Sequence, residues 1–277
     1  MITSRQNAAV KRARALAHGK DVSTSAVMLV EGVRLIEDSL TEGIRYDTVL
    51  VSPRLEGTER GAALRERLLR SGNTLLEATD DVLQAISDIA ADQGVAGLAY
   101  KRAWKLKNML PAGRAALVAV VWGVQDPGNL GTIIRTADAA GATGVIAAFR
   151  SACPCNTKCI RATMGSIFRL PVIEVNAEEA PLRELSTQVL HELRQHGVIL
   201  VGTSVASGIK HTEVDFRRPV AIVLGGEGAG VPEAVQDLCA LSVRIPIRRE
   251  VESLNVASAA AVLLYEAARQ RDFGGLV

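Results

Sequence analysis

The chain has 277 residues, of which 48% are hydrophobic and only 3% aromatic, and its formal net charge is +2. This length can bury one large core or two ordinary ones without disulfide bonds, and so few aromatic residues favour an α/β protein packed from Ala, Val, Leu and Ile. No apolar run reaches the ~20 residues that cross a membrane, and neither a signal peptide nor a disulfide framework is indicated, so we expect a cytoplasmic protein.

The first hundred residues predict a small α/β unit. We expect a basic helix at 4–17, further helices near 33–43, 64–69 and 81–87, and strands at 27–32, 48–52, 74–77 and 95–100. This stretch holds no cluster of His, Cys or carboxylate residues and no phosphate-type glycine loop. A recognition module is therefore expected here rather than a site of chemistry.

Two basic clusters flank this unit. Residues 1–20 and residues 101–114 each carry five Lys or Arg residues and no acidic residue. Such clusters can contact phosphates, and solvated charge is the alternative explanation. Pro111 and Gly113 predict a linker at 105–114, which gives two domains, 1–104 and 115–277.

The second domain begins with AALVAVVW (115–122), a continuous apolar run typical of a buried strand in a parallel sheet. Five further strands are expected at 144–148, 172–175, 198–202, 220–224 and 242–245, with helices at 132–141, 160–168 and 179–196. A last long helix follows Ser253, which is a candidate N-cap because its hydroxyl can accept a hydrogen bond from a helix amide.

Three loops rich in glycine and polar residues each follow an apolar strand. They span 123–137, 223–233 and 245–255. Because parallel strands present their carboxyl ends at one edge of a sheet, we expect these loops to converge on one crevice.

Several common chemistries are disfavoured. The loop GVQDPG lacks the Lys and Ser/Thr of a phosphate-binding P-loop, and GGEGAG does not extend to a dinucleotide fingerprint. The four histidines fall outside the three loops, so a Ser/His/Asp or Cys/His set is not indicated. Cys153, Cys155 and Cys159 form a C-x-C-x3-C cluster without a second pair nearby, and we therefore expect no metal, with a structural metal left as an alternative.

The three loops carry motifs of a known family. NLGTIIRTADAAGATGV, VLGGEGAGV and IPIRREVESLNVASAAAVLLYE resemble, in order, the three motifs of the SpoU/TrmH family of RNA ribose 2′-O-methyltransferases, and RATMGS at 161–166 resembles the family's RA-x-x-G segment. ITSRQNAAVKRARAL and VMLVEGVRLIEDSL are similar to the start and the substrate-binding domain of its ribosomal RNA members. The resemblance thus covers nearly the whole chain.

This resemblance implies a fold and a function. It implies an α/β domain with a parallel sheet and a trefoil knot, S-adenosylmethionine as methyl donor, a homodimer formed through the C-terminal domain, and ribosomal RNA of the large subunit as substrate. The family's cofactor contacts fall on Thr203, Leu224, Gly225, Gly226, Ile245 and Leu254. Its polar active-site residues fall on Asn129, Arg135, Glu227, Ser253 and Asn255.

Arg135 is the family's candidate for helping the 2′-hydroxyl lose its proton. Because an arginine side chain hardly ever gives up its own proton in a protein, we expect it to stabilise developing charge or to orient an RNA phosphate. The alternative is a surface cation paired with Asp138.

Two other functions remain open. A transfer RNA methyltransferase is the alternative with the same chemistry, but the tRNA enzymes that resemble this family generally lack the N-terminal domain. An RNA-binding relative without catalysis is the alternative of another class, and it is disfavoured because all five polar motif residues are present.

Overall fold

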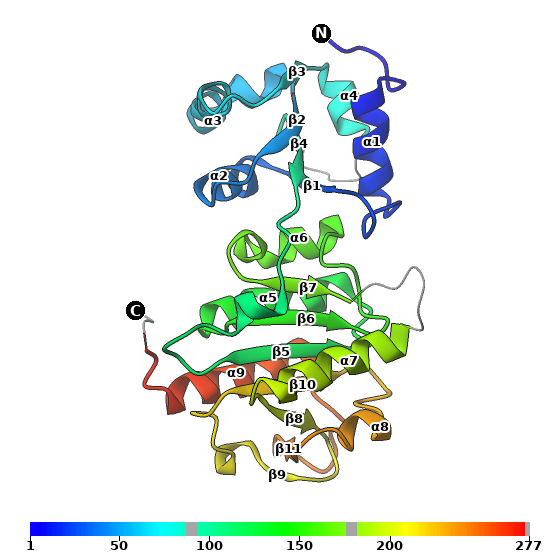
Figure 1. Cartoon of the computed structure of the whole chain (residues 1–277). Coiled ribbons are helices and arrows are strands. Elements are labelled where there is room, and N and C mark those ends of the chain that lie inside the picture. The colour runs from blue at the N-terminus through cyan, green and yellow to red at the C-terminus, as the bar shows by residue number, and fades with distance from the viewer. Residues whose placement is uncertain (87–92, 176–181, 275–277) are drawn as a thin grey trace. The chain divides into compact units, whose positions relative to one another are not determined.

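The computed structural model describes residues 1–86, 93–175 and 182–274, which form two compact units (Figure 1). Unit 1 consists of Met1–Ala103 together with Cys155–Arg169, and unit 2 consists of Trp104–Pro154 together with Leu170–Val277. The second segment of unit 1 falls inside the C-terminal domain that the sequence predicts. The observed boundary between the units therefore differs from the predicted one, because residues 155–169 pack into the core of unit 1.

Unit 1 is built on a four-stranded mixed sheet in the order β1-β4-β2-β3. Its strands are β1 (Val27–Glu31), β2 (Tyr46–Val51), β3 (Leu75–Glu77) and β4 (Val95–Tyr100). β4 runs antiparallel to both β1 and β2, and β3 runs parallel to β2. All four predicted strands are confirmed to within two residues, and the apolar runs of β1, β2 and β4 are mostly buried in the sheet.

Four described helices lie in the N-terminal segment of unit 1, and polar side chains cap two of them. They are α1 (Ala8–Ala17), α2 (Val33–Thr41), α3 (Glu59–Arg70) and α4 (Asp80–Gln84), with a short 3₁₀ turn η1 at Pro53–Gly57. Asn7 accepts a bond from the amide of Ala9, so α1 begins four residues later than predicted, and Thr58 caps α3, which begins five residues earlier. The predicted helix over 81–87 ends at Gln84, and Ser87 lies outside the described residues.

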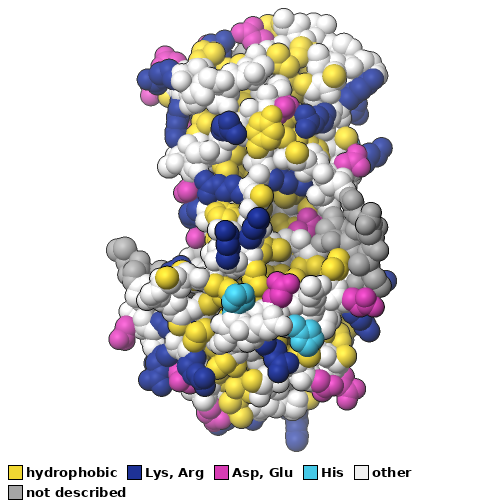
Figure 2. Space-filling view, in the orientation of Figure 1, with side chains coloured by type: hydrophobic (Ala, Val, Ile, Leu, Met, Phe, Trp, Pro, Cys, Tyr) yellow, Lys and Arg dark blue, Asp and Glu magenta, His cyan; other side chains and the backbone are white. Residues whose placement is uncertain are grey.

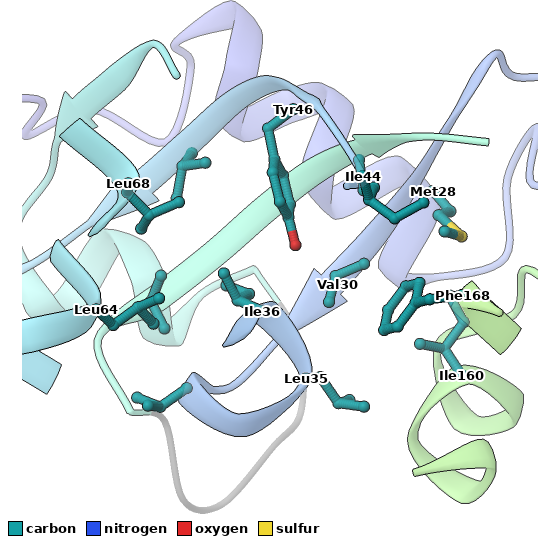
Figure 3. Close-up of a cluster of buried hydrophobic side chains, with 14 of the residues drawn as sticks. Met28, Val30, Leu35, Ile36, Ile44, Tyr46, Leu64, Leu68, Ile160 and Phe168 are labelled. Carbon is teal, nitrogen blue, oxygen red and sulfur yellow. The ribbon is translucent and has the colours of Figure 1, made fainter. Parts of the chain in front are cut away.

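The core of unit 1 takes in a segment from far along the chain. Helix α6 (Thr157–Thr163) and the turn η3 (Ser166–Phe168) replace the single predicted helix at 160–168. Ile160 and Phe168 are at most 1% exposed and point into the cluster that contains Val30 and Tyr46 (Figure 3). This burial explains why residues 155–169 belong to unit 1.

Unit 2 contains a seven-stranded sheet in the order β7-β6-β5-β10-β8-β11-β9. Its strands are β5 (Leu117–Trp122), β6 (Gly144–Ala148), β7 (Val172–Glu174), β8 (Ile199–Thr203), β9 (Ile209–Lys210), β10 (Val220–Gly225) and β11 (Leu241–Arg244). Every pairing is parallel, which confirms the predicted α/β class. The six predicted strands are present; β9 was not predicted, because two exposed residues give no hydrophobic signal.

Helices cover both faces of this sheet (Figure 1). They are α5 (Pro127–Ala139), α7 (Leu182–Gln195), α8 (Glu233–Gln236) and α9 (Val256–Gln270), with a turn η4 at His211–Glu213. α5 packs against α9, whereas α7 and α8 cover the face that carries Val118 and Val120. The first three residues of the predicted helix at 179–196 lie outside the described residues.

The predicted linker packs onto unit 2. The turn η2 (Leu106–Met109) places Met109, which is fully buried, in the cluster beneath α7 and α8. No helix in the part of the chain that the structure describes is long and apolar enough to cross a membrane. The trefoil knot stays a prediction of the family resemblance.

Two helix starts that position the site differ from their predictions. α5 begins at Pro127 rather than at residue 132, because Asp126 caps it through the amide of Asn129 at 2.8 Å and proline suits the first helical position. The N-cap of α9 is Asn255 and not Ser253, since the Asn255 side chain accepts from the amides of Ala257 and Ser258.

Candidate functional site

A cavity of about 420 Å³ opens in unit 2 at the carboxyl ends of β10, β8 and β11. All six predicted cofactor residues line it: Thr203, Leu224, Gly225, Gly226, Ile245 and Leu254. Glu227, Ser253 and Asn255 line it as well. Its size falls in the range of small-molecule sites, and its position is where ligands bind in open parallel sheets.

The glycine loop after β10 forms one wall and leaves no room for side chains at its base. A Cβ atom on Gly225 would lie 2.0 Å from the carbonyl carbon of Gly230, and one on Gly226 would lie 2.1 Å from the oxygen of Gly123. The Gly226 amide also donates to the carbonyl of Trp122 at 2.8 Å. The loop is therefore held close to the end of β5, and it offers backbone groups to a ligand.

Three polar motif residues form one hydrogen-bonded chain. Asn255 uses its Oδ1 to cap α9, and its Nδ2 donates to Oδ1 of Asn129 at 3.1 Å. Nδ2 of Asn129 in turn donates to Oε1 of Glu227. Because helix amides require the oxygen of Asn255 on their side, its amide nitrogen must face Asn129, and this orients Asn129 toward Glu227. The chain joins the starts of α5 and α9 to the glycine loop.

The wall at the end of β8 is held by a residue that the sequence did not indicate. Gln236 on α8 donates from Nε2 to the carbonyl oxygen of Thr203 at 2.8 Å. The Thr203 hydroxyl donates to the carbonyl of Val223 at 3.0 Å, so it is engaged inside the sheet. No sequence motif marks Gln236, because its role depends on how α8 docks.

Cys239 follows α8 in the sequence. Burial raises the pKa of its thiol to about 11, so this thiol stays protonated at neutral pH.

Charge in the cavity has one sign. Glu227 and Glu252 line it, and no Lys or Arg is found among its lining residues within the described chain. Glu252 was not among the predicted site residues, although it lies beside Ser253 in the third motif loop. Two carboxylates with apolar neighbours suit a ligand that carries positive charge.

Arg135 stands apart from this set. It is exposed on α5 and does not line the cavity. No hydrogen bond or ion pair engages it within residues 1–86, 93–175 and 182–274, so the alternative of a pair with Asp138 is not observed. Ser253 lines the cavity but is exposed and caps no helix. The structure thus brings together four of the five predicted polar residues and leaves Arg135 outside the cavity.

Two known protein families match different parts of the chain. Residues 116–265 match the SpoU rRNA Methylase family, and residues 7–97 match the MRM3-like substrate binding domain. The chain is 32% identical over 264 residues to the 23S rRNA (guanosine(2553)-2′-O)-methyltransferase RlmP of Bacillus subtilis, with 95% of this chain and 97% of that protein covered. It is 38% identical over 213 residues to the 23S rRNA (guanosine-2′-O-)-methyltransferase RlmB of Xylella fastidiosa, with 75% and 82% covered.

A solved structure shows the same likeness over the whole chain. The SpoU methyltransferase AviRb from Streptomyces viridochromogenes, in complex with AdoMet, has a TM-score of 0.84 and 30% sequence identity, with 96% of this chain and 99% of that chain covered. The chain belongs to the SpoU rRNA methylase family.

Proposed function

We propose that this protein transfers a methyl group from S-adenosylmethionine to a ribose 2′-hydroxyl of RNA, and that the RNA is 23S ribosomal RNA. The observation that carries this proposal is the hydrogen-bonded chain Asn255–Asn129–Glu227, which ends at the cofactor-sized cavity. The names of RlmP and RlmB, relatives matched over most of their length, support the choice of 23S rRNA. Because ribosomes are found in the cytoplasm, this substrate implies that the protein acts there.

The cavity fits S-adenosylmethionine in shape and charge. Leu254 and Ile245 give apolar surface for an adenine, and the crowded glycine loop presents backbone groups without side chains. Glu227 and Glu252 suit a sulfonium and an ammonium group. When bound, this cofactor supplies an electrophilic methyl group, and the protein's own residues must place a ribose oxygen in line with it.

Glu227 is the group that accepts the hydroxyl proton in this proposal. It lines the cavity, and Asn129 holds one of its carboxylate oxygens, which leaves the other oxygen for the ribose. Asn255 acts through Asn129 and keeps the carboxylate in place. A carboxylate accepts a proton more readily than a guanidinium, so Arg135 is assigned to the RNA phosphate or the developing alkoxide.

Unit 1 supplies RNA affinity. On the face drawn in Figure 2, Lys and Arg side chains are spread over unit 1 with Asp and Glu side chains between them. Distributed cations contact phosphates, which positions an RNA without reading its bases. The match of residues 7–97 to a substrate binding domain supports this role.

The proposal includes a homodimer through unit 2. On α9, Val262 is 38% exposed and Tyr265 is 45% exposed, beside the helix that carries Arg135. A second copy on this surface would cover both apolar side chains and could receive Arg135 at its site. Light scattering should report twice the chain mass, and Val262→Glu with Tyr265→Glu should halve it; a wild-type monomer contradicts the dimer.

The substrate is tested by incubating the protein with labelled S-adenosylmethionine and, separately, with 23S rRNA and transfer RNA. Mapping of 2′-O-methyl stops should reveal one modified ribose in the ribosomal RNA. Modification of transfer RNA alone would replace the proposed substrate with the alternative. No transfer to either RNA would contradict the activity itself.

A further inference from the structure

Two arginines converge on one aromatic ring at the carboxyl end of β6. Phe149 directly follows this strand, and the guanidinium carbons of Arg150 and Arg183 lie 5.4 Å and 5.3 Å from the centre of its ring. Both arginines are exposed, and Arg183 lies in the first turn of α7. Residues far apart in the sequence thus place two positive charges over one platform.

Among the residues that the structure describes, no acidic side chain pairs with either Arg150 or Arg183. The two guanidinium carbons lie 5.4 Å and 5.3 Å from the same ring centre, so they are at most about 11 Å apart and their like charges repel. The ring is fixed, because it stacks on Trp122 with centres 5.5 Å apart and planes inclined by 29°. An anion bound between the two guanidiniums would relieve the repulsion.

Arg150 also occupies a backbone conformation that favours glycine. Its φ angle is 56°, in a turn closed by the Ser151 amide, which donates to the Ala148 carbonyl at 3.0 Å. The left-handed region is unfavourable for a residue with a Cβ atom, and such strain is found at functional sites more often than elsewhere. If the stability of the fold were the only requirement, glycine would be the more favourable residue at this position.

Hydrogen bonds join this turn to the loop that leads to Asn129. The Ser151 hydroxyl accepts from the Val124 amide at 3.2 Å and donates to the Val121 carbonyl at 3.0 Å, and the Ala152 amide donates to the Val124 carbonyl at 2.8 Å. β6 pairs with β5, and β5 pairs with β10, whose end bears the glycine loop of the cavity. The arginine pair therefore lies at the same edge of the sheet as the candidate site, on one rigid framework.

We propose that Arg150 and Arg183 bind a backbone phosphate of the RNA next to the methylated nucleotide, with Phe149 holding the two guanidiniums apart. The planar fork of arginine matches phosphate oxygens, and two such forks beside one aromatic ring can bind the same phosphate group. This proposal relies on the proposed function for the identity of the anion as RNA and for the methylated nucleotide beside it. It adds a substrate-positioning site in unit 2, separate from the basic surface of unit 1.

The test compares RNA binding by the wild type and by Arg150→Gln/Arg183→Gln over a range of salt concentrations. Loss of two phosphate contacts should reduce the slope of log K against log[salt] by roughly 1.4 to 1.8, which corresponds to about 25- to 60-fold weaker binding at 0.1 M salt. S-adenosylmethionine affinity should not change. Arg217→Gln, an exposed arginine of unit 2 already paired with Asp215, is the matched control and should bind RNA as the wild type does.

Arg150→Gly separates binding from folding. Glycine relieves the strain at φ 56°, so the unfolding temperature should stay the same or rise, while RNA affinity falls because one of the two phosphate contacts is lost. If Arg150 had only a structural role, Arg150→Gly would lower the unfolding temperature and leave RNA affinity unchanged, and this result would overturn the proposal. So would a double variant with the wild-type salt slope. If the wild type methylates no RNA and the double variant still loses RNA binding, the proposed activity fails and the phosphate site stands.

Discussion

Asn255 and Asn129, 126 positions apart in the sequence, are joined by a side-chain hydrogen bond of 3.1 Å. The same Asn255 side chain caps α9, so the start of that helix and the start of α5 share one amide group. Local helix capping and the geometry of the site therefore depend on a single residue, and substitutions at Asn255 can separate the two roles.

Asn255→Asp should lower the methylation rate without lowering stability. The carboxylate still accepts from the helix amides, and negative charge is favourable at a helix start, but it cannot donate to Asn129. We expect a rate about 10- to 100-fold lower, from the loss of one orienting hydrogen bond. Asn255→Ala is the comparison and should lose about 1 kcal/mol of stability as well. A single-turnover rate equal to the wild type in the aspartate variant would remove the chain from the mechanism.

Leu254→Arg should abolish S-adenosylmethionine binding, because it puts bulk and positive charge into the cavity that Leu254 lines. Val251→Arg is a matched control, since Val251 lies in the same loop with similar exposure, 44% against 38%, and does not line the cavity. Calorimetric titration should show binding only in the control. Equal affinity in both variants would place the cofactor elsewhere. Gly225→Trp cannot test cofactor binding alone, because even a Cβ atom at Gly225 would clash with the backbone of Gly230 and disturb the loop.

Arg135→Ala should lower kcat by roughly 10²- to 10³-fold while the affinity for S-adenosylmethionine stays nearly the same, as expected for one lost electrostatic stabiliser. Arg135→Lys should recover little, since a compact ammonium cannot reproduce the planar fork. The measurement is single-turnover methylation of the protein's own RNA. A wild-type rate in the alanine variant would leave Arg135 as an exposed cation without a role in the reaction.

The basic residues that follow unit 1's last strand should divide into two classes. Lys101 donates to the carbonyls of Val22 and Ser23 at 2.5 Å and 3.2 Å, and Arg102 donates to that of Glu42, so these two help to hold unit 1 together. Lys105 and Lys107 are exposed. Replacing both exposed lysines with glutamine should flatten the salt dependence of RNA binding by up to roughly 1.4 to 1.8. Lys101→Gln should instead lower the unfolding temperature. A larger change of salt slope in Lys101→Gln than in the double variant would contradict this division.

Phe168→Ala tests the unusual composition of unit 1. Phe168 is fully buried among residues of the N-terminal sheet, and removing its ring should cost about 3 to 5 kcal/mol of unfolding free energy. Arg169→Ala changes the next residue, which is exposed and outside that cluster; it is the comparison and should cost less. Urea unfolding followed by circular dichroism gives both values. Equal losses would mean that the segment 155–169 adds little to the core of unit 1.

Much of the fold follows from local pattern, and what does not follow depends on tertiary packing. The central strands of both sheets were predictable because their apolar runs are continuous and buried, whereas the exposed two-residue strand β9 was not predicted. The start of α5 was missed although Asp126-Pro127 is a good helix-start signal, since the glycines after it suggest a loop. The placement of Ile160 and Phe168 in unit 1 has no local signal, because it arises from contacts between distant segments.

The same distinction applies to the site. Loops at the ends of parallel strands predicted one crevice, and the cavity lies there. The direction of each amide in Asn255 and Asn129 was not predictable, because it follows from the helix cap that only the folded chain creates. Gln236 and the arginines around Phe149 were not indicated either, since docking of α8 and α7 places them.

The most direct test of the central claim is the chemical position of the transferred methyl group. Wild-type protein is incubated with 23S rRNA and S-adenosylmethionine labelled in its methyl group, and the RNA is digested to nucleosides for mass spectrometry. The account predicts label in the ribose of a single 2′-O-methylnucleoside, with the label lost when Glu227→Gln replaces the wild type. Label on a base, or an undiminished ribose label in the Glu227→Gln reaction, would contradict it.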